Sequence, residues 1–113
     1  MKVDRLVPRA VARLQFSLRF RKFVPRDKGC YALATFDNHV LYVGLTENLH
    51  ERFAQHCNTK SKREPTTIGR AFWFYYLVCA EKDLCRIERT WMNQYMEIHG
   101  ILPILNRVNS PIR

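Results

Sequence analysis

The segment G-C-Y-A-L-A-T-F-D-N-H-V-L-Y-V-G, residues 29–44, decides the fold of this chain. It contains two runs rich in aliphatic, aromatic and β-branched residues, 29–36 and 39–44, separated by Asp37-Asn38. Asp and Asn both tolerate left-handed backbone angles, and two such residues between strand-like runs are typical of a tight turn. The segment therefore predicts a β-hairpin with a two-residue loop.

The register of this hairpin brings two tyrosines together. With a two-residue loop, Tyr31 pairs with Gly44 and Tyr42 pairs with Leu33. Both phenols then lie on one face of the sheet, on a diagonal of about 7–8 Å, whereas a slip of one residue would separate them. Tyrosine is also an ordinary strand residue, so the pair alone does not identify a site.

Three further segments complete the predicted fold. Residues 47–57 predict a helix capped by Thr46, the apolar run 71–80 predicts a strand buried on both faces, and residues 84–99 predict a helix that ends at Gly100. The order of elements predicts an α+β domain with a three-stranded antiparallel sheet flanked by helices. The apolar stripe of the last helix is Leu84, Ile87, Trp91, Tyr95 and Ile98.

The charge of the chain is unevenly distributed. Its 113 residues include 19 Lys and Arg against 10 Asp and Glu, a net charge of +9, and residues 1–28 hold nine of these basic residues and two Asp. Basic and apolar residues are mixed there, which favours a structured arm with a helix beginning near Pro8 over a loose tail. We therefore divide the chain into a basic N-terminal extension, 1–28, and one folded domain, 29–113.

A second basic segment precedes the last predicted strand. Residues 59–67 have the composition of an exposed loop. A localised excess of positive charge favours a polyanionic partner, here DNA, although a solvated surface kept basic for solubility is the alternative. The candidates for phosphate contact are Lys60, Lys62, Arg63 and Arg70.

The composition argues against several other classes of protein. The longest apolar run, 71–80, is about half as long as a membrane-crossing helix. The amino terminus lacks the apolar core of a secretory signal, and the four cysteines form no C-x-x-C pair. We therefore expect a soluble, cytoplasmic protein without a membrane partner. A basic protein lying on anionic membranes is an alternative, but no strongly amphipathic helix is evident outside residues 1–28.

Three more polar residues suggest a reactive site. Arg52 and His56 are four apart, so they share one face of the helix that directly follows the hairpin. Glu88 lies at the edge of the apolar face of the last helix, where a carboxylate is costly unless it is paired or bound to a metal. A salt bridge to an arginine is the simpler explanation of Glu88. With Tyr31 and Tyr42, these side chains offer phenols, a guanidinium, an imidazole and a carboxylate.

The spacing of these residues resembles that of the GIY-YIG nuclease superfamily. The matching motifs are G-C-Y at 29–31, Y-V-G at 42–44 and N-L-x-x-R-x-x-x-H at 48–56, followed by a helical Glu and a late Asn. The resemblance covers about residues 29–107. It implies a metal-dependent DNA endonuclease that hydrolyses phosphodiester bonds, one strand per active site, or else a DNA-binding module of the same fold without turnover. Double-strand cleavage or targeting would then need a homodimer or a partner protein.

The resemblance also implies a role for each site residue. Tyr31 and Tyr42 line the site, and one of them helps to deprotonate or orient the attacking water. Arg52 holds the scissile phosphate, and His56 assists proton transfer or binds phosphate. Glu88 is the protein ligand of one divalent cation, Mg²⁺ or Mn²⁺, a hard ion that prefers oxygen ligands. Asn106 supports the site by hydrogen bonding.

Overall fold

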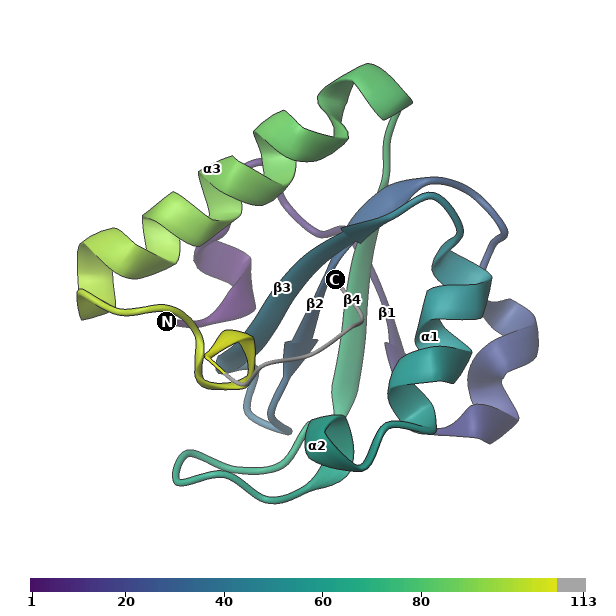
Figure 1. The fold of residues 1–113 in the computed structure, drawn as a ribbon, viewed down its shortest axis with the longest axis horizontal. Helices are drawn as coiled ribbons and strands as arrows, with labels where there is room; N and C mark the ends of the chain where they lie inside the picture. Colours follow the sequence, from purple (N-terminus) through teal and green to yellow (C-terminus); the bar gives the residue numbers. More distant parts are fainter. Residues whose placement is uncertain (108–113) are drawn as a thin grey trace.

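A four-stranded antiparallel sheet forms the centre of the computed structural model, which describes residues 1–107; positions 108–113 of the predicted domain lie outside the described residues. The α+β class and the antiparallel pairing are confirmed (Figure 1). The prediction of three strands is wrong, because the N-terminal segment supplies a fourth strand beside the last one. In sheet order the strands are β1 (Ala12–Gln15), β4 (Trp73–Val78), β2 (Gly29–Ala34) and β3 (Val40–Thr46).

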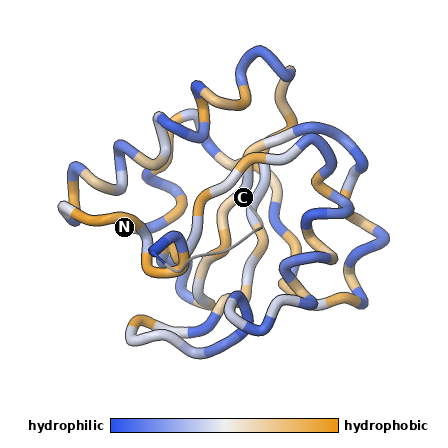
Figure 2. The backbone as a smooth tube through the Cα atoms, in the orientation of Figure 1, coloured by the Kyte–Doolittle hydropathy of each residue, from blue (hydrophilic) through white to orange (hydrophobic). Residues whose placement is uncertain are grey.

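Helices cover both faces of the sheet. The long helix α3 (Glu81–His99) packs on β2 and β3 from one side, whereas α1 (Leu49–Cys57) and the short helix η2 (Leu18–Phe23) lie on the other (Figure 1). Each side has its own apolar cluster, and along α3 hydrophobic and hydrophilic residues alternate turn by turn (Figure 2). The remaining elements are η1 (Val3–Arg5), α2 (Lys60–Arg63) and η3 (Ile104–Asn106).

The predicted helix near Pro8 is absent, and the basic N-terminal arm is built into the fold. The backbone of Val7 exchanges two hydrogen bonds with the side chain of Gln94 on α3, and Trp91 Nε1 donates to the carbonyl of Pro8 at 2.7 Å. These side chains satisfy backbone groups that a helix would otherwise pair, so the segment stays extended. Its buried apolar residues are Val3, Leu6, Ala10 and Val24.

The hairpin loop differs from the prediction, yet the predicted register of the tyrosines is confirmed. Thr35 and His39 close a three-residue loop in which Asn38 adopts φ of 73°, so a two-residue loop is wrong. A β-bulge follows the loop, where Ala34 pairs with Val40 but Leu33 pairs with Tyr42. This one-residue shift compensates for the extra residue in the loop. Tyr31 consequently pairs with Gly44, and Leu33 with Tyr42, as the sequence predicts.

The cap at the start of α1 differs from the prediction, whereas the end of α3 agrees with it. Asn48, not Thr46, caps α1, because its side chain accepts a hydrogen bond from the amide of Glu51. Helix α3 ends at Gly100, which has φ of 70°, as predicted. Of the predicted apolar stripe only Ile98 is exposed, and β4 is half-buried rather than buried on both faces, with Phe74 its one fully buried residue. Within residues 1–107, no helix combines the length and apolarity needed to cross a bilayer.

Candidate active site

Two glycines of the paired motifs allow close approaches that a side chain would block. A Cβ on Gly44 would lie 2.6 Å from both the ring and the hydroxyl oxygen of Tyr31 on the neighbouring strand. A Cβ on Gly29 would lie 2.5 Å from the carbonyl oxygen of Leu77 on β4. The phenol of Tyr31 therefore lies across the backbone of β3 in space that only glycine leaves free.

We expect Gly44→Ala to lower the free energy of unfolding by about 1–3 kcal/mol, because a buried ring must move to accept the methyl group. Tyr31 has little freedom to move, since it is fully buried and stacks on Phe74 with 5.1 Å between ring centroids. Urea denaturation measures the change. In a Tyr31→Leu background the same substitution should cost clearly less, and an equal cost in both backgrounds would contradict the assignment.

Four of the six predicted site residues come together on the α1 side of the sheet. The hydroxyl of Tyr31 lies 2.6 Å from Nε2 of His56, and the ring of Tyr42 lies 6.0 Å from that of Tyr31 and 5.2 Å from that of His56. Arg52 is close enough to influence the ionisation of both Tyr31 and His56. Three separate segments, β2, β3 and α1, thus supply one cluster.

Burial controls the protonation of this cluster. Loss of solvent raises the pKa of Tyr31 well above 10, with Tyr42 adding to the rise and Arg52 opposing it. Loss of solvent, together with Lys62 and Arg52, lowers the pKa of His56 to about 3. Both side chains are therefore neutral near pH 7. Arg52 can only donate, so we assign the Tyr31 proton to the bond with Nε2 of His56, which leaves a hydrogen on Nδ1.

The lowered pKa of His56 predicts a loss of stability in acid. The unfolded chain takes up a proton near the ordinary pKa of 6.5, but the folded chain resists it until about pH 3. Below about pH 6, the free energy of unfolding should therefore fall by about 1.4 kcal/mol per pH unit from this group. Urea denaturation between pH 7 and pH 4 measures the slope. His56→Gln should flatten it, His39→Gln should not, and an unchanged slope in His56→Gln would refute the cause.

Lys62 is a member of the cluster that the sequence did not reveal. The predicted exposed loop 59–67 instead contains α2, and Lys62 on that helix is fully buried. Its Nζ lies 4.7 Å from the centroid of the Tyr42 ring. Within the described part of the chain, residues 1–107, neither this Nζ nor Nδ1 of His56 has a hydrogen-bond partner. Burial lowers the pKa of Lys62. By contrast, the other predicted phosphate contacts, Lys60, Arg63 and Arg70, are exposed.

Glu88 comes from a different element, α3, than the residues of this cluster. It is on α3, 9% exposed, among the residues that pack on the opposite face of the sheet. There its charge influences the thiol of Cys30, whose Sγ donates to the carbonyl of Leu84 at 3.4 Å. Because α3 packs on β3, an edge strand, Glu88 and the tyrosine cluster lie on the two sides of the same strand.

Asn106 forms hydrogen bonds with the backbone at the outer edge of β3. Its Oδ1 accepts from the amide of Val43 and its Nδ2 donates to the carbonyl of Val43, both at 2.9 Å. The side chain thus takes the place of a neighbouring strand at the middle residue of the Y-V-G motif. Asn106 touches the site through the backbone that positions Tyr42 and Gly44.

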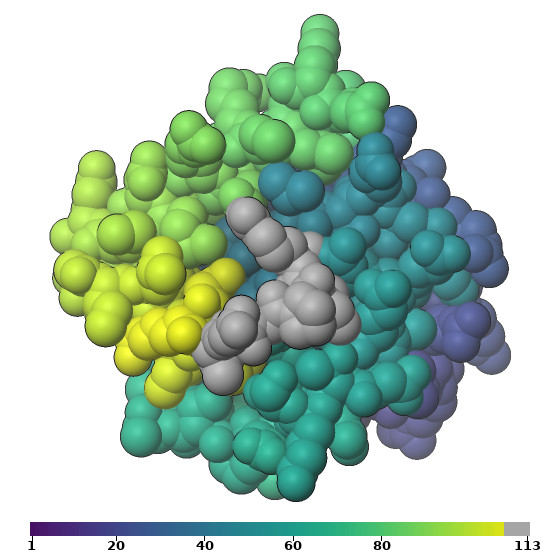
Figure 3. All heavy atoms as spheres, in the orientation of Figure 1, coloured from purple at the N-terminus to yellow at the C-terminus, as the bar shows by residue number. Residues whose placement is uncertain are grey.

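A surface cleft of about 340 Å³ opens where β3 leads into α1. Figure 3 shows the atoms of this junction between those of α3 and those of α1. Arg52 is the cluster residue that reaches the cleft, and it is held there by Gln55 Oε1 at 3.0 Å and by the carbonyl of Leu45 at 3.4 Å. The lining residues are Leu45, Thr46, Glu47, Asn48, Glu51, Arg52 and Gln55.

The oxygen donors set what metal the site can hold. Among residues 1–107, no group of three or more His, Cys, Asp or Glu side chains gathers in one place. A hard divalent cation can be held by a single carboxylate when water and phosphate complete its coordination. Glu88, a largely buried hard oxygen donor, fits that description.

The antiparallel sheet, the facing tyrosines and the arginine–histidine helix define the class of nuclease domain that the motifs predicted. The family model of the GIY-YIG catalytic domain matches residues 27–99, and the chain belongs to this family. It is 28% identical over 81 residues, 70% of its length, to UvrABC system protein C of Mesoplasma florum, and 29% identical over 76 residues, 66% of its length, to that of Mycoplasma capricolum. The matches span only 14% and 13% of those proteins.

Proposed function

We propose that the protein is a divalent-metal-dependent DNA endonuclease that hydrolyses phosphodiester bonds, one strand per active site. The observation that supports this most is the set of contacts made by Tyr31: its hydroxyl is hydrogen-bonded to His56, its ring stacks on Tyr42, and Arg52 lies nearby. Family membership and the net charge of +9 agree with a DNA substrate. Cleavage of both strands would take two such sites, in a homodimer or with a partner protein.

Arg52 binds the scissile phosphate. Arg52 is half-buried and lines the open cleft, so water screens its attraction for a phosphate less than it would at a fully exposed position. Gln55 and the carbonyl of Leu45 fix its orientation, which lowers the cost of ordering it when substrate binds. Negative charge that builds on the phosphate oxygens during attack is stabilised at this group.

Tyr42, rather than Tyr31, assists the attacking water. The pKa of Tyr31 is raised by burial, so its proton stays on the phenol, where it orients His56. Tyr42 is also buried, but the amine of Lys62 lies over its ring, and this nearby cation favours a phenolate that accepts the proton of the water. The neutral His56 presents its unpaired Nδ1–H as a donor to a phosphate oxygen.

Glu88 would hold the cation, which neutralises phosphate charge and activates the leaving oxygen when bound. Asn106 keeps β3 in place through Val43. The exposed Lys60, Arg63 and Arg70 contact the DNA backbone. Lys62 is buried and is therefore reassigned from DNA contact to the tyrosine cluster.

A DNA-binding module without turnover is the second candidate. It is supported by the near-complete burial of Tyr31, Tyr42 and His56, and by the position of Glu88 on the other face of the sheet. Cleavage requires water and phosphate to reach this cluster, whereas binding through the exposed basic residues does not.

Nicking of supercoiled plasmid separates the two candidates. The wild-type protein should convert supercoiled to nicked plasmid with Mg²⁺ but not with EDTA, and nicked molecules should precede linear ones. Glu88→Ala should abolish nicking, whereas Glu97→Ala, an exposed glutamate on the same helix, should retain it. Wild-type protein that binds plasmid without nicking it under any divalent cation supports the binding module instead.

A further inference from the structure

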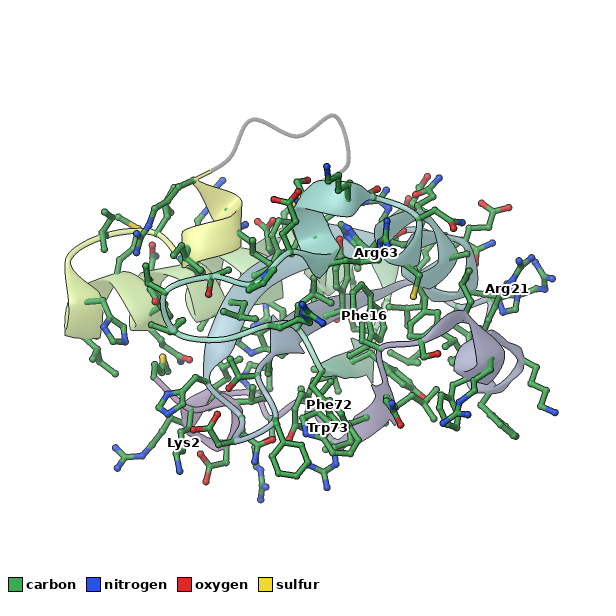
Figure 4. All side chains as sticks on the ribbon, turned by 90° about the horizontal axis from the view of Figure 1, so that it is seen from below. Lys2, Phe16, Arg21, Arg63, Phe72 and Trp73 are labelled. Carbon is green, nitrogen blue, oxygen red and sulfur yellow. The ribbon has the colours of Figure 1, made fainter. Side chains whose placement is uncertain are left out.

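A partly exposed group of aromatic rings and an arginine lies where the tip of the β2–β3 hairpin meets the start of β4. It consists of Phe36 at the hairpin tip, Phe72 and Trp73 at the start of β4, and Arg13 on β1, and is called the aromatic patch below. Phe36 is 70% exposed. Phe72 and Trp73 lie on the side of the molecule away from α2 and Arg63 (Figure 4).

The rings of the patch form a continuous row. Phe36 meets Phe72 edge to face at 5.0 Å between centroids, and Phe72 meets Trp73 in the same way at 4.9 Å. The guanidinium of Arg13 lies 3.8 Å from the centroid of the Trp73 ring. Large rings at the surface that alternate with a stacked guanidinium present flat faces and positive charge together.

Hydrogen bonds hold the row in place. Trp73 Nε1 donates to the carbonyl of Phe36 at 3.1 Å, which ties the hairpin tip to β4. Arg13 donates to the hydroxyl of Tyr75 at 3.2 Å and to Asn38 Oδ1 at 3.4 Å, and Tyr75 donates to the same Asn38 oxygen. The patch is therefore ordered before any ligand arrives, so binding needs little further ordering.

A small polar cavity adjoins the patch. Its volume is about 180 Å³, and it shares Asn38 and Tyr75 with the hydrogen bonds of Arg13. The cavity has two cationic residues, Lys2 and Arg9, against one acidic residue. Its lining residues are Lys2, Val3, Asp4, Arg9, Ala10, Asn38 and Tyr75.

We propose that the aromatic patch binds unpaired nucleotides of single-stranded DNA. Bases stack on Phe36 and the neighbouring rings, and a backbone phosphate lies at the cavity beside Lys2 and Arg9. Stacking on aromatic rings requires that the bases be free of a duplex, and it tolerates any sequence because every base has a flat face. The patch lies at the hairpin end of β3, whereas Arg52 and its cleft lie where β3 leads into α1, so the patch is a second DNA site beyond the proposed nuclease function.

The fluorescence of Trp73 reports on this site. The chain has two tryptophans, and Trp91 is fully buried, so bases that stack on the patch quench Trp73 selectively. An eight-residue oligothymidylate, titrated in EDTA, should quench the fluorescence of the wild-type protein. An oligonucleotide with the same backbone and abasic sugars, and a duplex of the same length, should bind about tenfold more weakly or worse.

Matched variants locate the binding. Phe36→Ser should weaken oligothymidylate binding by about tenfold, as loss of one stacked base predicts. Phe23→Ser should not weaken binding, although Phe23 is also largely exposed, at 58%, and its ring centroid lies 5.3 Å from the amine of Lys22. Equal binding by wild type and Phe36→Ser, or by thymidylate and abasic strands, overturns the proposal. So does sedimentation that shows a dimer lost in Phe36→Ser, because the patch would then be a protein interface. Binding in EDTA is independent of cleavage, so failure of the nuclease assignment leaves this test intact.

Discussion

Arg52→Ala is expected to reduce the rate of Mg²⁺-dependent plasmid nicking by about 10²–10³-fold, the usual effect of removing one group that stabilises transition-state charge. The guanidinium lies between the buried Tyr31–His56 pair and the open cleft, and within residues 1–107 no other cationic side chain lines that cleft. Folding should change little, since Arg52 is half-buried and its hydrogen bonds to Gln55 and to the carbonyl of Leu45 lie beside the open cleft.

Two further variants sharpen this test. Arg52→Lys should restore only a small part of the rate, because an ammonium cannot offer two parallel donors to a phosphate. Arg86→Ala removes an exposed arginine that pairs with Asp83 at 3.0 Å on α3, and it should nick as the wild type does. Nicking by Arg52→Ala within twofold of the wild-type rate would show that the cleft is not where the phosphate binds.

Lys62→Met should give two opposite changes: a more stable protein and a slower nuclease. A buried amine without a hydrogen-bond partner costs about 1–3 kcal/mol, so an apolar side chain of similar length should raise the free energy of unfolding by up to that amount. If the charge of Lys62 favours the phenolate of Tyr42, the variant should nick at least tenfold more slowly. Its rate should also keep rising to higher pH than that of the wild type.

Urea denaturation and nicking rates from pH 6 to pH 10 measure these two changes. Lys60→Met, which replaces the exposed lysine of the same helix, should alter neither stability nor the pH profile. A purely structural lysine would lower stability when replaced and leave the pH profile unchanged. A stabilised variant with the full wild-type rate would exclude Lys62 from the reaction.

The motif spacing predicted the centre of the site because that part of the fold is local. Tyr31, Tyr42, Arg52 and His56 lie within 26 consecutive residues, and hairpin pairing plus one helical turn suffices to place them. The loop is one residue longer than predicted, and the bulge between the loop and the tyrosines restores the predicted pairing. Alternation of faces along the strands, rather than the turn itself, preserved the register.

What the sequence did not predict depends on contacts between distant segments. β1 is a short strand of mixed polarity, and only its pairing with β4 makes it a strand. Lys62 was expected at the surface because residues 59–67 have the composition of an exposed basic loop. Its burial depends instead on how α2 packs after α1. The helical pattern correctly placed Glu88 at the edge of the apolar face of its helix. It did not predict that this helix packs on the face of the sheet opposite the tyrosines.

The participation of β1 in the sheet means that the folding unit is larger than the family motif. A fragment trimmed to the matched region, 27–99, would lose both β1 and Asn106. The backbone amide and carbonyl groups of β4 would then be unpaired at one edge of the sheet, and those of Val43 would be unpaired at the other. Exposed edge strands tend to pair with strands of other molecules. We expect such a fragment, which would carry every motif residue except Asn106, to aggregate through its open strand edges more readily than the full chain does.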